Sequence, residues 1–294
     1  MDQAEQLRNV IKQKCKGMQQ STARVVTITS GKGGVGKSNL AVNMAVWLSK
    51  MGKRVIIFDA DLGLANVEVM FGSVPQYNLS DLIYHGKSIR EIITQGPLGI
   101  GFISGGLGIV GLNNLPKDQI VYLVHSLAEL NEMADVIIVD TGAGISDSVL
   151  EFVMASPEIL LVSTPEPSSL TDAYSLLKAV YRNPIFSREK TKINVVANKV
   201  NSEEEGNAVF SKLESVVSQF LKGNINFLGM IPQDQEMERA VRGQKIVSLE
   251  KPNAPASRAF QVLTGNYIND EHEAISIHKG ITQLIINFLI RKSS

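Results

Sequence analysis

Cysteine is almost missing from this chain: among its 294 residues there is one, Cys15. A single cysteine excludes a framework of intrachain disulfides and any Cys-x-x-Cys metal or iron–sulfur site within one chain. Long apolar runs are missing too, since no stretch reaches the roughly 18 residues that a membrane-spanning helix needs. Asp2 and Glu5 occupy the start of the chain without an apolar core nearby, so we expect no signal peptide. These absences predict a protein of the reducing cytoplasm.

An excess of charge of either sign is also missing. Lysine plus arginine and aspartate plus glutamate each number 29, which gives a formal net charge of +0. Without an overall positive field, contact with a polyanion would need a local basic patch, so we expect no specific nucleic-acid partner. The hydrophobic share of 44% is ordinary for a globular protein with a sizeable core.

Apolar, β-rich segments alternate with helical patterns from residue 24 to about 265. Most of the strand candidates are continuously apolar, as residues 136–139 are, and such runs suit parallel strands buried on both faces. The sequence therefore predicts a doubly wound α/β fold, a mostly parallel sheet flanked by helices, with ligands at the carboxyl ends of its strands. Strands are expected near residues 25–30, 54–59, 100–104, 135–140, 158–163, 192–198 and 226–230. Helices are expected near residues 38–51, 78–85, 116–131, 145–154, 170–183, 203–221 and 234–242.

The most specific motif follows the first expected strand. Residues 31–38 fit the phosphate-binding pattern G-x-x-x-x-G-K-[ST] in its strand–loop–helix context. Glycines let successive backbone N–H groups converge on phosphate oxygens, and the next helix directs the positive end of its dipole at the same charge. We expect Lys37 to bridge the β- and γ-phosphates and the Ser38 hydroxyl to ligate Mg²⁺. The expected nucleotide-binding segment is Gly31, Lys32, Gly33, Gly34, Val35, Gly36, Lys37, Ser38 and Asn39.

Carboxylates follow two of the later expected strands. Asp59 and Asp61 come at the end of the second strand, and Asp140 comes at the end of the fourth. Beside a phosphate loop, such groups can hold Mg²⁺ directly or through water and can orient the attacking water. We predict Asp59 and Asp140 as metal ligands together with Ser38, and Asp61 and Lys37 as catalytic residues. Two plainer alternatives stay open: Asp61 caps the next segment, or Asp140 merely ends its strand.

The base of the nucleotide is expected near the end of the sixth strand. The amide of Asn198 both donates and accepts, so it can face a purine edge. A guanine site would want a carboxylate three residues further on, and this chain has Asn201 there. The loop with Pro232 and Asp234 is expected to add backbone contacts around the base. Adenine is therefore favoured, and ATP and ADP are the expected nucleotides.

These motifs resemble the deviant-Walker ATPases of the MinD/ParA family, and the similarity spans about residues 24–265. The resemblance implies Mg²⁺-dependent ATP hydrolysis and an ATP-dependent homodimer, in which the extra lysine reaches the phosphates of the partner subunit. Lys32 matches that lysine and becomes a third predicted catalytic residue. One more cation at the triphosphate stabilises the developing charge only when the dimer closes. The matching residues are Lys32, Lys37, Asp59, Asp61, Asp140 and the loop of residues 232–234.

Within that family, residues 2–8, 59–66 and 140–146 resemble flagellar-number regulators of the FlhG type, also called YlxH or FleN. By this resemblance, residues 1–20 are a partner-binding helix that contacts FlhF, a GTPase of the signal-recognition-particle type, and stimulates its hydrolysis. The C-ring proteins FliM and FliN or FliY are expected partners on the same ground. In the plainer alternative, the helix packs on its own domain. The predicted contact residues are Gln3, Leu7 and Arg8.

Residues 270–294 form a tail beyond the ATPase domain, which we place at residues 21–269. Five apolar residues of the tail recur at helical spacing and form one stripe, with polar residues on the other side. The pattern resembles the membrane-targeting helix of MinD-like proteins, which lies in an anionic membrane surface without spanning it. The alternative is that the stripe docks on the protein's own core. The stripe consists of Ile281, Leu284, Ile285, Phe288 and Leu289.

The sequence thus predicts an ATP-driven switch that is cytoplasmic, associates reversibly with the inner face of the cell membrane and controls the number or placement of flagella. A MinD-type regulator of the division site is one alternative, although MinD proteins usually carry a Ser-Pro-Ala-Gly element after the aspartate that matches Asp140. A nucleotide-bound scaffold with incidental turnover is the other. Iron–sulfur carriers of the same family are excluded, because this chain lacks their cluster cysteines.

Overall fold

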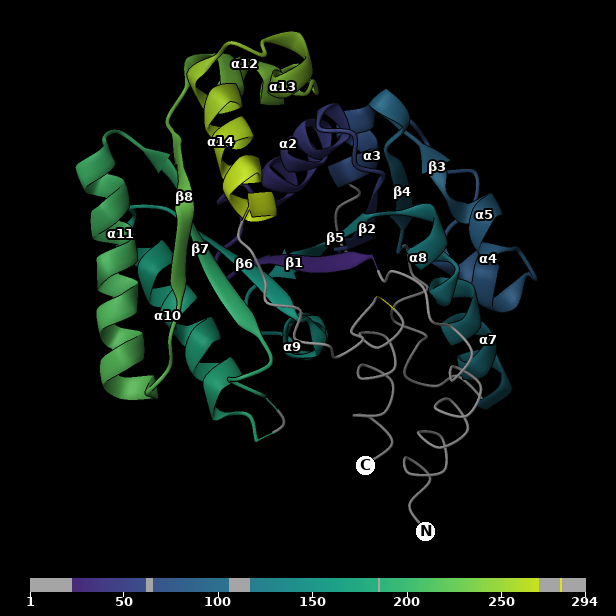
Figure 1. Cartoon of the computed structure of the whole chain (residues 1–294), viewed down its shortest axis with the longest axis horizontal. Coiled ribbons are helices and arrows are strands. Elements are labelled where there is room, and N and C mark those ends of the chain that lie inside the picture. The colour runs from purple at the N-terminus through teal and green to yellow at the C-terminus, as the bar shows by residue number, and fades with distance from the viewer. Residues whose placement is uncertain (1–22, 62–65, 106–116, 185, 270–280, 282–294) are drawn as a thin grey trace.

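The computed structural model describes residues 23–61, 66–105, 117–184, 186–269 and 281. Within these residues the strands form one sheet of eight, in the order β3-β4-β2-β5-β1-β6-β7-β8. Every pairing is parallel except that of β3 with β4. Helices cover both faces of the sheet (Figure 1), so the predicted doubly wound α/β fold is confirmed.

The apolar runs of the sequence form the strands. Every residue of β2 and β6 is buried, as strands covered on both faces require. Each strand that the sequence predicts is present, with ends that differ by a few residues. The added strand, β3, is too short to show a pattern in the sequence. The strands are β1 (Arg24–Ser30), β2 (Val55–Ala60), β3 (Thr94–Gln95), β4 (Gly101–Ser104), β5 (Val136–Ala143), β6 (Glu158–Ser163), β7 (Lys192–Val200) and β8 (Asn226–Pro232).

Helices connect the strands and pack on the sheet (Figure 1). The long helix predicted at residues 203–221 is an α-helix followed directly by a short π-helix, η3. The sequence pattern does not predict α3, α5, α13 or, most notably, α14. The described helices are α2 (Lys37–Lys50), α3 (Asn66–Phe71), α4 (Leu79–Tyr84), α5 (Ile89–Ile92), η1 (Pro97–Gly99), α7 (Lys117–Ala128), α8 (Leu130–Met133), α9 (Asp147–Ala155), α10 (Pro167–Arg182), α11 (Glu203–Val216), η3 (Val217–Leu221), α12 (Gln235–Arg242), α13 (Val247–Glu250) and α14 (Pro255–Asn269).

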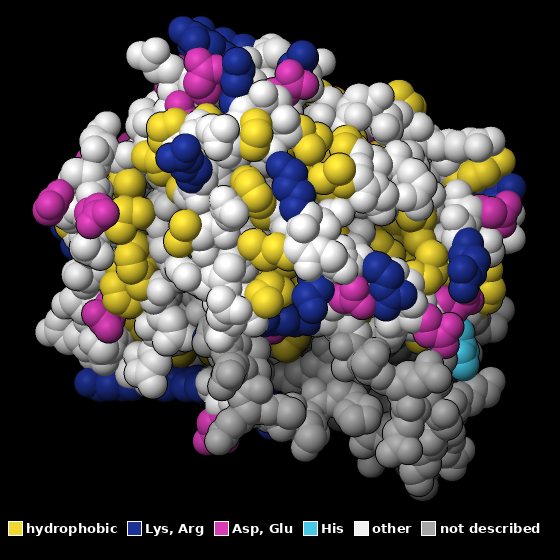
Figure 2. Space-filling model, turned by 45° about the horizontal axis from the view of Figure 1, so that its top comes forward, with side chains coloured by type: hydrophobic (Ala, Val, Ile, Leu, Met, Phe, Trp, Pro, Cys, Tyr) yellow, Lys and Arg dark blue, Asp and Glu magenta, His cyan; other side chains and the backbone are white. Residues whose placement is uncertain are grey.

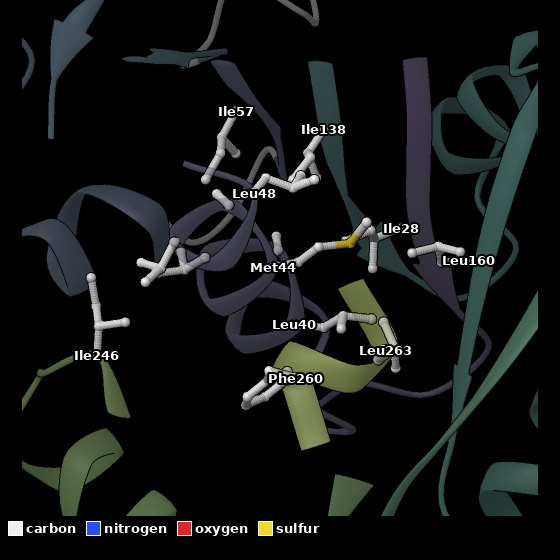
Figure 3. Packing of buried hydrophobic residues seen from close by; sticks show 14 of the residues in the cluster. Ile28, Leu40, Met44, Leu48, Ile57, Ile138, Leu160, Ile246, Phe260 and Leu263 are labelled. Carbon is white, nitrogen blue, oxygen red and sulfur yellow. The ribbon is translucent and has the colours of Figure 1, made fainter. Parts of the chain in front are cut away.

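Alternate residues of the central strands point to opposite faces of the sheet. On β1, Val26 and Ile28 belong to the cluster beneath α2 and α14, whereas Val25 belongs to the cluster on the other face. Figure 3 shows Leu40 and Met44 of α2 packed between the strands and α14. A fully buried aliphatic side chain contributes about 1.5–3 kcal/mol, so this packing fixes α2, and with it the phosphate loop, on the sheet.

A polar contact also joins α2 to α13. The backbone N–H of Ser248 donates to Oδ1 of Asn43 over 3.0 Å, and its carbonyl accepts from Nζ of Lys50 over 2.7 Å. The indole N–H of Trp47 donates to Oγ of Ser248 over 3.1 Å. One turn of α13 is therefore held by three successive turns of α2.

Arg24 joins β1 to α14 at the amino ends of the central strands. The phosphate loop lies at the opposite, carboxyl ends. Arg24 donates two hydrogen bonds to the Glu158 carboxylate, over 2.7 and 2.8 Å. Its third bond reaches the carbonyl of Tyr267 over 2.7 Å, and the guanidinium carbon lies 3.8 Å from the centre of that tyrosine ring. Arg24 thus ties together β1, β6 and α14.

The surface and the tail bear on the predicted partners. On the face shown in Figure 2, Lys and Arg side chains are scattered among acidic and neutral ones. No helix in the described residues is both long enough and apolar enough to cross a membrane. Ile281 is buried in the cluster that holds Leu123 and Leu127, which is the environment that docking on the core requires at this position.

Candidate nucleotide site

A loop of residues 31–36 connects β1 to α2 at the carboxyl edge of the sheet. A Cβ on Gly31 would lie 2.1 Å from the backbone of Asp172, and one on Gly36 would lie 2.3 Å from Nδ2 of Asn198. Gly36 also has a φ of +102°, in the left-handed region that favours glycine. Glycine is therefore required at both positions, and it allows α2 to begin at Lys37 directly after the loop.

Two successive carbonyl groups of the loop accept hydrogen bonds from residues at the end of β7. Nζ of Lys199 donates to the carbonyl of Gly34 over 3.0 Å, and Nδ2 of Asn198 donates to that of Val35 over 2.7 Å. In a trans peptide the N–H points opposite to the carbonyl, so the N–H groups of Val35 and Gly36 point away from the end of β7. This arrangement, with the helix N-terminus of α2, suits an anion.

Lys37 and Asp140 form a buried charged centre behind the loop. Both carboxylate oxygens of Asp140 are buried, without a hydrogen bond of normal geometry to the described residues. Burial raises the pKa of Asp140 to about 7, against the opposing effects of the Ser38 hydroxyl and the Lys37 ammonium. Burial also lowers the pKa of Lys37, partly offset by the charges of Asp140 and Asp61. A ligand that brings compensating charges would stabilise both ionised groups.

Two further carboxylates lie at the end of β2. Asp59 is in register with Asp140 on β5, and its Oδ1 accepts from the backbone N–H of Asp61 over 3.1 Å. Burial, and next the charge of Asp140, raise the pKa of Asp59 to about 8. Oδ1 of Asp61 lies 3.5 Å from the position of a Cβ on Gly142, so this side chain extends toward β5. The fold thus gathers the three predicted carboxylates on adjacent strands.

The residues fit a magnesium ion that is bound together with a nucleotide. In the part of the chain that the structure describes, no group of three or more His, Cys, Asp or Glu side chains could hold a metal ion by itself. Mg²⁺ at a nucleotide needs only one or two protein carboxylates, because phosphate oxygens and water fill its other positions. The unsatisfied oxygens of Asp140, close to the Ser38 hydroxyl, match that requirement.

Lys32, the first of the two lysines in the phosphate-binding motif, makes contacts within its own chain. Nζ of Lys32 donates to Oε2 of Glu166 over 2.6 Å and to Oγ of Ser168 over 2.7 Å, at the start of α10. The hydrogen bond and charge of Lys32 lower the pKa of Glu166. The pair is exposed, and water and salt screen such ion pairs, so they add little to stability. Lys32 is therefore weakly held in this structure.

Asn198 and Asn201, which bear on the predicted base contact, bind groups of the protein in this structure. Nδ2 of Asn198 donates to the carbonyl of Val35 in the loop, and Oδ1 of Asn198 accepts from the backbone N–H of Lys199 over 2.9 Å. Nδ2 of Asn201 donates to Oε2 of Glu205 over 3.0 Å. The base contact of Asn198 stays a prediction, and the structure adds that this residue supports the loop.

Asp234 serves two helices. Its Oδ1 accepts from the backbone N–H of Glu236 over 2.9 Å and caps α12, while its Oδ2 accepts from that of Ala256 over 2.9 Å in the first turn of α14. Pro232 pairs in register with Val200 at the end of the sheet. Contacts from this loop to the base stay a prediction.

Comparison with known proteins decides the family. The profile of the CobQ/CobB/MinD/ParA nucleotide binding domain matches residues 26–247, which is most of the chain. The chain belongs to this family. The antiactivator FleN of Pseudomonas aeruginosa is 39% identical over 240 residues, which cover 82% of this chain and 84% of FleN. The flagellum site-determining protein YlxH of Helicobacter pylori is 36% identical over 264 residues, which cover 87% of this chain and 86% of YlxH. The predicted resemblance to flagellar regulators is confirmed.

Solved structures of MinD share the fold of this MinD/ParA-family chain. The MinC:MinD cell division complex of Aquifex aeolicus matches with a TM-score of 0.67 and 24% identity, covering 85% of this chain and 97% of that chain. MinD of Pyrococcus horikoshii, complexed with Mg-ADP, matches with a TM-score of 0.65 and 20% identity, covering 84% and 96%. By its family, this protein is a nucleotide-binding ATPase.

The roles of Lys199, Glu166 and Ser168 at the loop are not predicted from the sequence. The dipeptide Asn198-Lys199 at a strand end was the available signal for Lys199. Asn39, predicted in the binding segment, lies in the first turn of α2. Several predicted partner and membrane residues lie outside the described residues: Gln3, Leu7, Arg8, Leu284, Ile285, Phe288 and Leu289.

Proposed function

We propose that this protein is a Mg²⁺-dependent ATPase that works as a molecular switch. The observation that carries the proposal is the burial of Lys37 and Asp140 next to a glycine loop in which two successive carbonyls are fixed by hydrogen bonds. The loop N–H groups and Lys37 bind the triphosphate, while Ser38 and Asp140 hold the metal and Asp59 its water shell. When bound, Mg²⁺ neutralises charge on the β- and γ-phosphate oxygens.

Hydrolysis then requires Asp61 and a second copy of the chain. Asp61 lies beside the buried centre and orients the attacking water. Lys32 leaves Glu166 and Ser168 and binds the phosphates of the partner subunit, where it stabilises charge in the transition state. The weak hold on Lys32 in a single subunit supports this exchange, because little stability is lost when Lys32 departs.

Binding and turnover of ATP by variants test the assignment. Lys37→Ala should weaken binding of a fluorescent ADP analogue at least about tenfold, the equivalent of about 1.4 kcal/mol. Lys53→Ala removes an exposed lysine just after α2 and serves as the matched control. Asp61→Ala should keep ATP binding and lose phosphate release. Unchanged affinity in Lys37→Ala would remove the basis of the proposal.

The relation to FleN and YlxH supports a role in controlling the number or placement of flagella. We propose that residues 1–20 contact FlhF and stimulate its GTPase, and that FliM and FliN or FliY are further partners. A protein without residues 1–20 should bind ATP normally but fail to stimulate FlhF; full stimulation would refute this part. A pull-down with ATP-loaded protein separates this role from a MinD-type role, which would bring down a division inhibitor.

Reversible membrane binding is the remaining part of the proposal. Leu284, Ile285, Phe288 and Leu289 would enter the interface, and Ile281 would have to leave the core cluster in which it is buried. Sedimentation with anionic liposomes should pellet the protein with ATP and leave it in solution with ADP. Equal pelleting with both nucleotides would reject the switch.

A scaffold with incidental turnover is distinguished by Asp61→Ala, which would leave the cellular function of a scaffold intact.

A further inference from the structure

The end of β7 contains a bulge at Lys199. Asn198 pairs with Ile231 of β8 and Val200 pairs with the next residue, Pro232, so β7 carries one extra residue between them. Lys199 has a φ of +57°, in the left-handed region that a residue with a Cβ occupies only at a cost. Such bulges occur next to active sites, where they re-aim side chains.

The bulge has a definite consequence for two adjacent side chains. In a regular strand Asn198 and Lys199 would point to opposite faces of the sheet. Here both reach the phosphate loop, on the successive carbonyls of Val35 and Gly34, over 2.7 and 3.0 Å. The left-handed backbone is therefore associated with a pair of contacts that an ordinary strand end could not make.

We propose that Lys199 is a positioning residue of the nucleotide site. Together with Asn198 it fixes two successive peptide groups of the loop, so that their N–H groups face the phosphates before the nucleotide arrives. A loop that is already ordered loses less conformational freedom on binding, and the affinity is higher for that reason. The role of Lys199 rests on the proposed nucleotide binding. It adds to that site a residue that does not itself bind the nucleotide or the metal.

Lys199→Gly separates positioning from folding, because glycine adopts the left-handed backbone without strain. The melting temperature of the variant should stay the same or rise. Its Kd for a fluorescent ADP analogue should rise about fivefold to tenfold, as expected for one exposed charge-assisted hydrogen bond. The KM for ATP should rise likewise, with kcat at saturation little changed. Lys199→Arg keeps a long cationic donor and should restore most of the affinity.

Lys222→Gly is the matched control. Lys222 is also exposed and has a left-handed backbone, with a φ of +51°. It lies after η3, away from the phosphate loop, and its carbonyl accepts from Arg188. This substitution relieves the same backbone strain without touching the loop, so the Kd should not change. If Lys199→Gly kept the wild-type Kd, or if Lys222→Gly lost as much affinity, the positioning role of Lys199 would be wrong. The proposed nucleotide binding would not be affected. Absence of nucleotide binding in the unmutated protein would overturn the proposed function with it.

Discussion

At the scale of single residues, the candidate site holds acids where burial opposes their ionisation. The pKa is raised to about 7 for Asp140 and to about 8 for Asp59. An acid whose pKa is higher in the folded than in the unfolded chain makes folding less favourable once it ionises. Sites that must receive Mg²⁺ and phosphate commonly lower the stability of the fold in this way.

Replacing Asp140 by asparagine should therefore stabilise the nucleotide-free protein. Burial of this carboxylate does not lower the free energy of unfolding below the unfolded pKa of 3.8. The loss grows as the pH rises toward about 7 and is constant above that. At pH 8 we expect Asp140→Asn to raise the free energy of unfolding by at least about 2 kcal/mol, because each unit by which the pKa is raised costs about 1.4 kcal/mol. Urea unfolding at pH 4 and pH 8 without Mg²⁺ measures the gain, which should be small at pH 4. ATP turnover should be lost.

Asp135 is the control of opposite sign. Its hydrogen bonds with Arg54 lower its pKa, so its contribution to stability is present above the unfolded pKa and is lost as the pH falls through the folded one. Asp135→Asn should accordingly destabilise the protein at pH 8 and have little effect at low pH. If both variants shifted stability in the same direction at pH 8, the electrostatic account of Asp140 would be wrong.

At this scale the sequence indicated the loop and the three carboxylates, because a phosphate site needs those residue types at strand ends in a fixed order. It could not indicate the bulge that directs Lys199 to Gly34, because a left-handed lysine has no signature in composition or period. The partner of Lys32, Glu166, lies 134 positions away and is set by the packing of α10.

At the scale of elements, continuous apolar runs identify strands because a central parallel strand is buried on both faces. The same reasoning misses α14, whose buried face includes Ser257 and Thr264 as well as apolar residues, so that its helical period is interrupted. The edge strand β3 has only two residues, and α5 and α13 have four each, which is too short for a recognisable period.

Asp234 is expected to matter chiefly for these elements. Its side chain caps α12 and bonds the first turn of α14, and each cap of this kind contributes about 1 kcal/mol. Asp234→Ala should therefore lower the free energy of unfolding by about 2 kcal/mol, with the Kd for ADP little changed. Chemical unfolding and nucleotide titration give the two quantities. Gln233→Ala, at the exposed neighbour, is the control, and a large change of Kd at constant stability would indicate a side-chain contact with the base.

At the scale of the whole molecule, Arg24 joins the first strand to the last described helix. Its side chain is 21% exposed and that of its partner Glu158 is 9% exposed, so the pair is largely removed from water. Removing one partner of such a pair typically costs about 3 kcal/mol or more, and we expect that loss for Arg24→Met in thermal or urea unfolding. Arg54→Met disrupts the far more exposed pair with Asp135, which water and salt screen, and should cost much less. Equal losses would show that burial is not the deciding factor.

The proposed dimer makes a prediction that no single subunit can satisfy. If Lys32 acts on the partner's phosphates while Asp61 acts in its own subunit, Lys32→Ala and Asp61→Ala should each be inactive alone and active when mixed. In a mixed dimer, the site of the Lys32→Ala subunit keeps its own Asp61 and receives Lys32 from the Asp61→Ala subunit. Random pairing in a two-fold dimer completes about a quarter of all sites, so phosphate release should recover to about that fraction of the wild-type rate. If Lys32 acted within its own subunit, no site in the mixture would be complete, and the mixture would stay as inactive as its parts.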